Sequence, residues 1–364
     1  MLKETKSIAD LNIFDIIILL GVWEEGLAKR EKLDDTREIQ LITLKTAILP
    51  QGKFWRIIKS IEWFLRIIVV FSKENIVMVN CHSLPVLSVG MIFKTFKHSK
   101  VIYDTHELET ETATMSRIRK LFSKILERLL INHVDSVIVV SNSIADWYKN
   151  QYKLKTVNVV RNVPYYCDTK YVQPRILKER FNIPQNHVLY IYQGMLSTER
   201  GIEILLSVFS KLNNNRHIVF MGYGPLENSI KKYEAEYPNI HLQPAVKPEE
   251  ITHFTSSADI GICIIKSTCL SYYYSLPNKL FEYIMSGLPV IVNDFPEMAK
   301  FVDDNKIGWK VPADEESISQ LIKETSIVEI EEKRDNVLNC KNKFSWEIES
   351  KNLSKVYKEY TAPH

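Results

Sequence analysis

Short apolar runs alternate along the chain with longer stretches in which apolar residues recur every three or four positions. The runs are rich in Val and Ile, as buried parallel strands are. We predict strands at 14–20, 38–44, 76–80, 100–104, 136–140, 157–160, 188–192, 217–221, 240–242, 259–265, 290–292 and 307–311. Because helical stretches separate these strands, the pattern favours an α/β protein with parallel sheets.

Two helical stretches in the first half of the chain carry basic residues. The stretch 53–71 has an apolar stripe of Phe54, Ile58, Ile61, Leu65 and Ile68, and Trp55, Lys59 and Arg66 occupy another face. The stretch 116–130 has a net charge of +4 over 116–128. Such helices suit either an anionic membrane surface or a core-packed position with a solvated basic face, and the sequence leaves both interpretations open.

The most informative stretch is 275–294, which is predicted to form a loop, a helix, a turn and a strand. Pro277 suits the first turn of a helix, and Gly287 followed by Pro289 suits its end. Lys279 and Glu282 lie near the predicted helix N-terminus, where free N–H groups and the helix dipole favour a phosphate. A capped surface helix with solvated charges would give the same pattern.

The run P-N-K-L-F-E-Y-x-x-x-G-x-P-V-I resembles the nucleotide-sugar signature of glycosyltransferase family 4. The resemblance implies a GT-B fold, in which two Rossmann-like doubly wound domains face each other and a C-terminal helix crosses back. It implies retaining transfer from a nucleotide sugar, most simply a UDP-sugar. Because no carboxylate cluster of metal-site type is visible in the sequence, we expect no metal ion or other cofactor. Glu282 matches the family glutamate that holds the ribose. The glutamate that usually lies eight positions earlier, where it touches the donor sugar, is replaced by Tyr274.

A second group of polar residues follows the predicted strand 100–104, in the run D-T-H-E-L. Asp104, His106 and Glu107 lie where strand carboxyl ends line the ligand crevice of a doubly wound sheet. The run also resembles an acceptor-domain motif of family 4, in which the His faces the transferred sugar and diphosphate. His82, in C-H-S-L, matches a vaguer pattern and is interpreted as structural.

The second half of the chain supplies the donor site on this interpretation. Arg200 lies at a helix start after a strand and a glycine turn, where its guanidinium can clamp a diphosphate. Together with the family resemblance, these positions predict that His106, Arg200 and Lys279 are catalytic and that Asp104 and Glu107 lie on the acceptor side. The donor-binding residues are Gly194, Gly222, Tyr223, Val246, Tyr274, Leu276, Asn278 and Glu282.

Length and composition set the broad limits. The 364 residues suffice for two domains, which we place at 1–165 and 166–344, with a crossover helix at 345–364 and a linker at 165–174. The net charge of +3 does not suggest a nucleic-acid binder. Five scattered cysteines indicate neither a disulfide framework nor a zinc site, so a reducing cytosol is the expected compartment. The polar N-terminus is unlike a secretory signal, and the apolar region 57–71 is interrupted by charges.

These observations predict a retaining hexosyl- or N-acetylhexosaminyltransferase that binds a nucleotide-sugar donor and a glycan acceptor. The basic helices predict a peripheral protein at the inner face of a membrane, which extends a lipid-linked glycan of bacterial surface-polysaccharide type. Three alternatives remain open at this point: a soluble acceptor, a sugar-nucleotide epimerase of similar shape, and a non-catalytic subunit that binds the donor without transfer.

Overall fold

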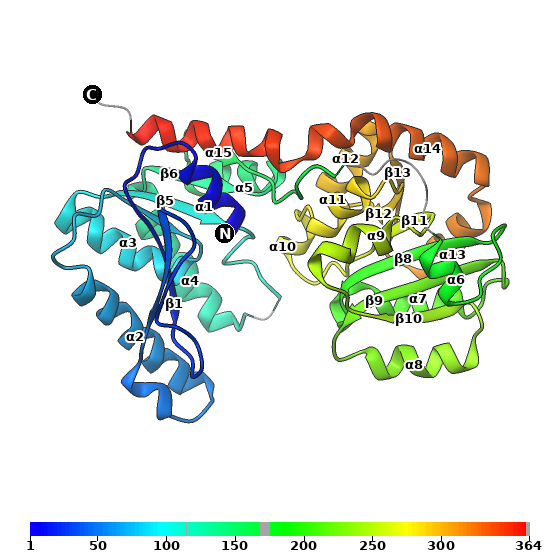
Figure 1. Cartoon of the computed structure of the whole chain (residues 1–364), viewed down its shortest axis with the longest axis horizontal. Coiled ribbons are helices and arrows are strands. Elements are labelled where there is room, and N and C mark those ends of the chain that lie inside the picture. Colours follow the sequence, from blue (N-terminus) through cyan, green and yellow to red (C-terminus); the bar gives the residue numbers. More distant parts are fainter. Residues whose placement is uncertain (114, 168–174, 362–364) are drawn as a thin grey trace.

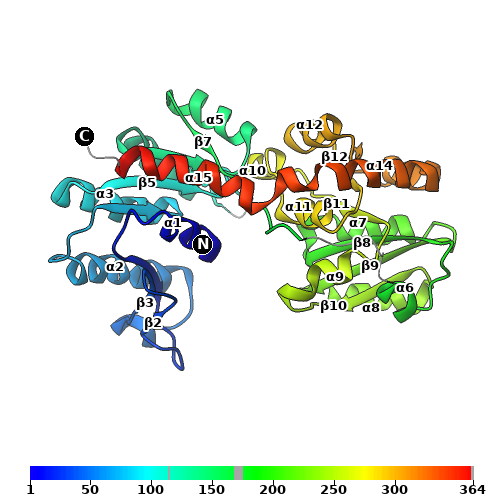
Figure 2. The same cartoon turned by 45° about the horizontal axis from the view of Figure 1, so that its top comes forward.

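The computed structural model describes residues 1–113, 115–167 and 175–361. It shows two α/β domains side by side, with the long helix α15 (Trp346–Thr361) running from the second domain across the first (Figure 1). Figure 2 shows the same course of α15 from a tilted direction. The predicted fold class, two parallel-sheet α/β domains with a helix that crosses back, is confirmed.

Within residues 1–113 and 115–167, the first domain contains two small sheets and five α-helices. Its strands are β1 (Ile17–Val22), β2 (Arg30–Lys32), β3 (Arg37–Ile42), β4 (Met78–Cys81), β5 (Lys100–Thr105), β6 (Ser136–Val139) and β7 (Asn158–Val159). Its helices are α1 (Leu2–Ala9), α2 (Lys53–Val70), α3 (Leu84–Lys97), α4 (Arg117–Leu130) and α5 (Asn142–Tyr152). The sheet orders are β1-β3-β2 and β4-β5-β6-β7, and β2 alone pairs antiparallel.

The second domain is built on one six-stranded, fully parallel sheet of order β10-β9-β8-β11-β12-β13. Its strands are β8 (Val188–Met195), β9 (Arg216–Tyr223), β10 (Ile240–Pro244), β11 (Ile260–Cys263), β12 (Val290–Asn293) and β13 (Gly308–Val311). Its helices are α6 (Ile176–Arg180), α7 (Ile202–Phe209), α8 (Glu227–Glu236), α9 (Ile251–Thr255), α10 (Leu270–Tyr273), α11 (Asn278–Met285), α12 (Pro296–Asn305), α13 (Glu315–Glu324) and α14 (Ile327–Cys340).

Local signals explain where several of these helices begin and end. Ser141 caps α5 by accepting a hydrogen bond from the backbone N–H of Ile144, and Asp314 caps α13 in the same way. Pro277 precedes the first residue of α11, and Gly287 follows the helix with φ at +80°, a left-handed conformation that favours glycine. The predicted loop, helix, turn and strand at 275–294 is therefore confirmed.

Helix α15 completes the first domain although it lies at the other end of the chain. The Tyr357 hydroxyl accepts a hydrogen bond from Asn80 at 2.8 Å, and the Tyr360 hydroxyl donates to the carbonyl of Asp135 at 2.6 Å. Trp346 is buried in a core cluster that contains residues of both domains. The domain limits at 165 and 344 stay a prediction, and most of the proposed linker, 168–174, lies outside the described residues.

The interpretation of the faces of α2 is wrong. The apolar stripe, which the core-packed alternative would bury, is more than half exposed at Phe54, Ile61 and Leu65, and only its end at Ile68 packs against the core. Lys59, proposed as an exposed charge, instead donates hydrogen bonds to backbone carbonyls, at 2.8 Å for that of Leu49, and Arg66 pairs with Glu62 at 2.6 Å. Helix α2 packs through another apolar face, which includes the buried Ile67. Trp63, Phe64 and Ile67 of the packed face lie among the polar positions of the helix, so its periodicity did not identify that face.

Within residues 1–113, 115–167 and 175–361, no helix combines the length and the apolar character that crossing a bilayer requires.

Candidate active site

Two glycines open the carboxyl edge of the second sheet. Gly194 at the end of β8 lies in register with Gly222 at the end of β9, with φ of +121° and +157°. A Cβ atom on Gly222 would lie only 1.9 Å from the carbonyl oxygen of Gly194, so only glycine fits there. The absence of side chains lets a ligand approach this backbone closely, at the edge where doubly wound sheets bind their ligands.

Lys279, in the first turn of α11, presents a buried ammonium group to this edge. Its Nζ lies 3.8 Å from the centroid of the Tyr192 ring and makes no hydrogen bond within the described residues. Burial is the main cause that lowers the pKa of Lys279 to about 8. The nearby positive charge of Arg200 acts in the same direction, and Cys263 and Glu282 oppose it. A buried cation without a hydrogen bond, next to a second cation, is a site that an anion would stabilise.

Arg200 lies in the short helix Thr198–Arg200 before α7, with its guanidinium carbon 5.3 Å from the centroid of the Tyr272 ring. The hydroxyl of Tyr272 also donates to Glu199 at 3.0 Å, which fixes the ring against this turn. Arg200 and Lys279 come from separate elements, and they lie close enough for the charge of Arg200 to act on the pKa of Lys279.

Glu282 lies one turn further along α11 and is held by Gln193. The side-chain amide of Gln193 donates to the Glu282 carboxylate at 2.5 Å and accepts from Thr255 at 2.5 Å. Burial raises the pKa of Glu282, and the hydrogen bond from Gln193 opposes this shift. Sequence reasoning missed Gln193, although a polar residue in the apolar run of β8 immediately before Gly194 was a usable signal.

The other predicted donor residues surround the same edge. Tyr223 ends β9 and is exposed, Val246 lies in the loop after β10, Leu276 is buried just before α11, and Asn278 is the exposed first residue of α11. Their contacts with a donor stay predictions.

Tyr274 takes part in a contact between the two domains. Its carbonyl accepts a hydrogen bond from the Ser141 hydroxyl at 3.0 Å, and its side chain packs against the core of the first domain. Close by, the Ser271 hydroxyl in α10 accepts from the backbone N–H of Leu108 at 3.3 Å and donates to the carboxylate of Glu107 at 3.4 Å. The segment around Tyr274 therefore joins the two domains beside the strand ends where His106 and Glu107 lie, which we call the acceptor edge after the role predicted for it.

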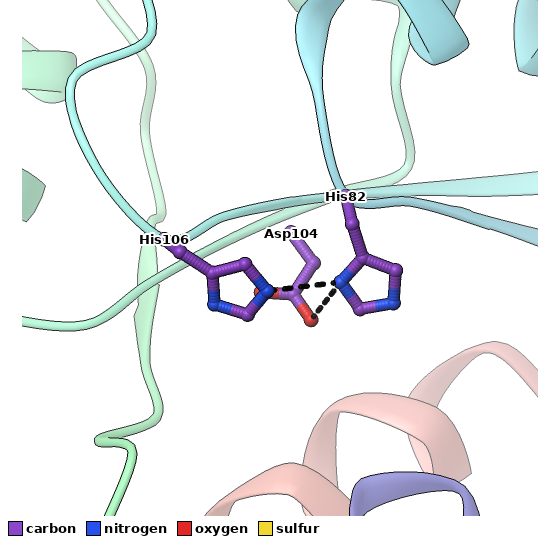
Figure 3. A group of neighbouring side chains, drawn as sticks. All are labelled: His82, Asp104 and His106. Carbon is purple, nitrogen blue, oxygen red and sulfur yellow. Dashed lines mark hydrogen bonds and ion pairs between the residues drawn. The ribbon is translucent and has the colours of Figure 1, made fainter. Parts of the chain in front are cut away.

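Three side chains meet at the acceptor edge of the first domain (Figure 3). Strands β4 and β5 pair with Cys81 opposite Tyr103, so that His82 and Asp104 follow side by side. His82 Nδ1 lies 3.2 Å from His106 Nε2 and 3.4 Å from the Asp104 carboxylate. Burial raises the pKa of Asp104 to about 6 and lowers that of His82 to about 4. The sequence analysis treated His82 as structural, whereas the structure places it in the group that contains His106.

This group is also the place to ask about a metal ion. The ligand atoms of His82, Asp104 and His106 lie within 4.8 Å of one another, a donor set that a divalent transition metal could accept. The two facing ring nitrogens are already at hydrogen-bond distance, so a hydrogen bond from one imidazole to the other would account for the geometry without a metal ion. The expectation that no metal is needed stays a prediction.

Helix α1 contributes two charged residues that sequence reasoning did not consider. Lys3 Nζ donates to the carbonyl of Val163 at 2.6 Å, and Lys3 and Glu282 are close enough to influence each other's pKa. Glu4 is buried, which alone would raise its pKa, but the ion pair with the N-terminal amine of Met1 at 2.9 Å outweighs burial and lowers it; His82 and His106 lie close enough to contribute. The helix thus lies between the donor and acceptor edges. Its mostly polar sequence gave no apolar period that would have revealed it.

The two halves of the chain match two family models. The model "Glycosyltransferase Family 4" matches residues 27–163, and the model "Glycosyl transferases group 1" matches residues 175–342. The sucrose-phosphate synthase of Thermosynechococcus elongatus has a similar structure, with a TM-score of 0.74 and 15% identity over 98% of this chain and 91% of that one. The HepE protein of Anabaena, in complex with UDP-glucose, has a TM-score of 0.67 and 11% identity over 88% and 86%.

A curated relative with a matching sequence is the chitobiosyldiphosphodolichol beta-mannosyltransferase of the yeast Kluyveromyces lactis. It is 22% identical over 336 residues, which cover 82% of this chain and 73% of that protein. Two Rossmann-like domains with a glycine-lined edge and a crossing helix make up the GT-B fold. By the two models that match its halves, the chain belongs with the glycosyltransferase family 4-like proteins.

Proposed function

We propose that this glycosyltransferase transfers a hexosyl or N-acetylhexosaminyl group from a nucleotide-diphosphate sugar to a lipid-linked glycan. The observation that carries the proposal is the buried ammonium of Lys279, which makes no hydrogen bond in the described part of the chain and lies near Arg200. Two converging cations at the N-terminus of α11 suit the diphosphate of such a donor.

Similar proteins support both substrates. The structure of HepE holds UDP-glucose, which favours a UDP-sugar as donor for this chain. The yeast relative is named for a diphosphodolichol-linked acceptor, which favours a lipid-linked acceptor. That relative is eukaryotic, so the surface-polysaccharide role expected from the sequence has no support from it.

The residues divide the work of transfer as follows. Arg200 and Lys279 stabilise the negative charge that grows on the leaving diphosphate, and the free N–H groups of α11 add to this effect. Glu282, oriented by Gln193, accepts hydrogen bonds from the ribose hydroxyls. His106 orients the transferred sugar from the opposite domain. Because these groups supply the positive charge, we expect transfer to persist in the presence of EDTA.

The stereochemical course has two candidates. The family resemblance implies retention, in which an oxygen of the donor phosphate takes the acceptor proton. The name of the yeast relative favours inversion, because transfer from an α-linked donor to a β-product inverts the anomeric carbon. Inversion needs a base near the acceptor hydroxyl, and Asp104, with its pKa raised to about 6, is suited to that role. The one-bond carbon–proton coupling at the anomeric centre of the product, measured by NMR, decides between the two.

The proposal is tested by transfer of labelled sugar from a panel of UDP- and GDP-linked hexoses to a diphosphopolyprenol-linked chitobiose. Arg200→Ala and Glu282→Ala should each lower kcat/KM by at least about a hundredfold while the circular dichroism spectrum is unchanged. Lys231→Ala and Glu236→Ala, two exposed changes on α8, serve as matched controls. Normal turnover by both site variants would show that the donor site is wrongly placed.

The remaining alternatives give different results in the same assay. A sugar-nucleotide epimerase would convert the donor to an isomer without any acceptor. A non-catalytic subunit would bind the donor by calorimetry and turn over nothing across the panel.

A further inference from the structure

Two helices of the first domain turn apolar side chains toward solvent. On α2 the exposed side chains are Phe54, Ile57, Ile61, Leu65 and Val69, and on α4 they are Ile118, Leu121, Phe122, Ile125 and Leu129. The spacing of each set follows one helix face. On α4 the exposed fractions reach 72% for Ile118 and 67% for Phe122. Contiguous exposure of large apolar residues marks a surface that another body covers.

The exposed charges on the two helices themselves are all basic. The side chains of Lys53 and Arg56 on α2, and of Arg117, Arg119 and Arg128 on α4, are exposed and basic. The acidic residues of both helices are turned inward. Glu127 of α4 is fully buried and accepts hydrogen bonds from three tyrosine hydroxyls, and Glu62 of α2 binds backbone N–H groups and Arg66.

The two helices share a neighbour. Helix α3 packs against both α2 and α4, and all three lie below α15 in the view of Figure 1. Helix α4 also follows the acceptor edge directly, since the loop from His106 leads into it. Glu111 in that loop pairs with Lys120 and Lys124 of α4, each at 2.5 Å. A body bound to α4 would therefore lie next to the residues that face the acceptor.

We propose that the exposed faces of α2 and α4 form a docking surface for an anionic lipid bilayer. Apolar side chains flanked by Lys and Arg match the two parts of such a surface, its acyl boundary and its negative headgroups. A second copy of the chain fits less well, because a two-fold interface would bring the same basic residues against each other. The inference rests on the proposed function in one respect: a bilayer is where a lipid-linked acceptor would be found.

The test is co-sedimentation of the full chain with vesicles, without donor or acceptor. The vesicles contain phosphatidylcholine alone or with about one third phosphatidylglycerol, at low and high salt. The native protein should bind the anionic vesicles at low salt and retain part of this binding at high salt. The paired change Leu121→Gln with Phe122→Gln should lower the partition coefficient by at least about tenfold. The matched control, Ile327→Gln with Val328→Gln, changes two exposed apolar residues of the second domain and should have no effect.

A second pair of changes tests the basic part of the surface separately from its apolar part. Arg117→Glu with Arg119→Glu should remove the preference for anionic vesicles, whereas Lys231→Glu with Lys232→Glu on α8 should keep it. The proposal is overturned if the native protein stays in the supernatant at low salt, or if the Leu121 and Phe122 changes leave binding intact. It is also overturned if the native protein is a dimer in the presence of vesicles and the Leu121 and Phe122 changes convert it to a monomer.

Failure of this inference is distinguishable from failure of the proposed function. Vesicle binding without any sugar transfer would count against the enzymatic proposal alone. Transfer to a short-chain, water-soluble acceptor by a protein that ignores vesicles would count against the docking surface alone.

Discussion

Replacing Lys279 by Met should stabilise the unliganded protein and weaken donor binding at the same time. The pKa of Lys279 falls from 10.5 to about 8 in the folded protein, so the charged form costs the fold about 3 kcal/mol at pH 7. Loss of the contact between Nζ and the Tyr192 ring offsets about 0.5–2 kcal/mol of this gain. A net increase of about 1–3 kcal/mol follows, because the desolvation cost exceeds the cation–π contact.

The pH dependence of this effect has a definite sign. Between pH 8 and 10.5 the unfolded chain binds more protons at this lysine than the folded chain, so native stability rises with pH there. The cost of the charged lysine therefore falls to about 1 kcal/mol at pH 10. The advantage of Lys279→Met should be largest at pH 7 and shrink toward pH 10.

Thermal unfolding at both pH values measures the change, at about 2–4 °C per kcal/mol for a domain of this size. Lys232→Met, at an exposed site on α8, is the matched control and should shift nothing. Titration with UDP should show weaker binding by the Lys279 variant at pH 7. A variant that is less stable than the native protein at pH 7, or one whose advantage is equal at pH 7 and 10, would refute the argument.

Two further changes test the two edges of the site. Gly222→Ala should destabilise the protein by more than about 4 kcal/mol in urea unfolding, because the new Cβ atom would collide with the carbonyl oxygen of Gly194. The control is Gly26→Ala, whose Cβ atom would have no other atom within 4 Å, and it should cost only about 1–2 kcal/mol. Equal losses would show that the glycine contact is unimportant. Asp104→Asn should lower transfer yet raise stability at pH 7 by up to about 3 kcal/mol, because burial raises the pKa of Asp104 to about 6 and the charged carboxylate then destabilises the fold. This cost vanishes as the pH falls toward 4, where the carboxyl group is protonated in the folded protein. A constant stability difference from pH 4 to pH 7 would contradict this.

The periodicity of apolar residues predicted most strands and helices because each strand is a short buried run with a polar or glycine boundary. Helix α1 and strand β2 were missed since neither has such a run: β2 is exposed at all three positions. In helix α2 periodicity found the apolar stripe but not the packed face, because much of the stripe is exposed and the helix packs through Trp63, Phe64 and Ile67. Periodicity identifies a packed face only when the other face is polar.

The candidate site was foreseen where its residues share one segment. Lys279 and Glu282 lie a turn apart on α11, and the sequence alone placed both near a helix start. The partnerships of Glu282 with Gln193 and of His106 with His82 depend on which strands are neighbours, and a single sequence does not give this pairing. Both histidines do follow the carboxyl ends of consecutive strands, which was a usable signal.

The crossing of α15 has a consequence for synthesis on the ribosome. Asn80 finds its partner Tyr357 only 277 residues later in the chain. At about 5–20 residues per second, roughly a quarter of a minute to a minute passes between the synthesis of Asn80 and that of Tyr357, in the helix that covers the core of the first domain. The second domain, whose sheet is complete by Val311, can close first. The nascent first domain therefore exposes apolar surface throughout that interval, and a chaperone would find its target there rather than in the later-made half.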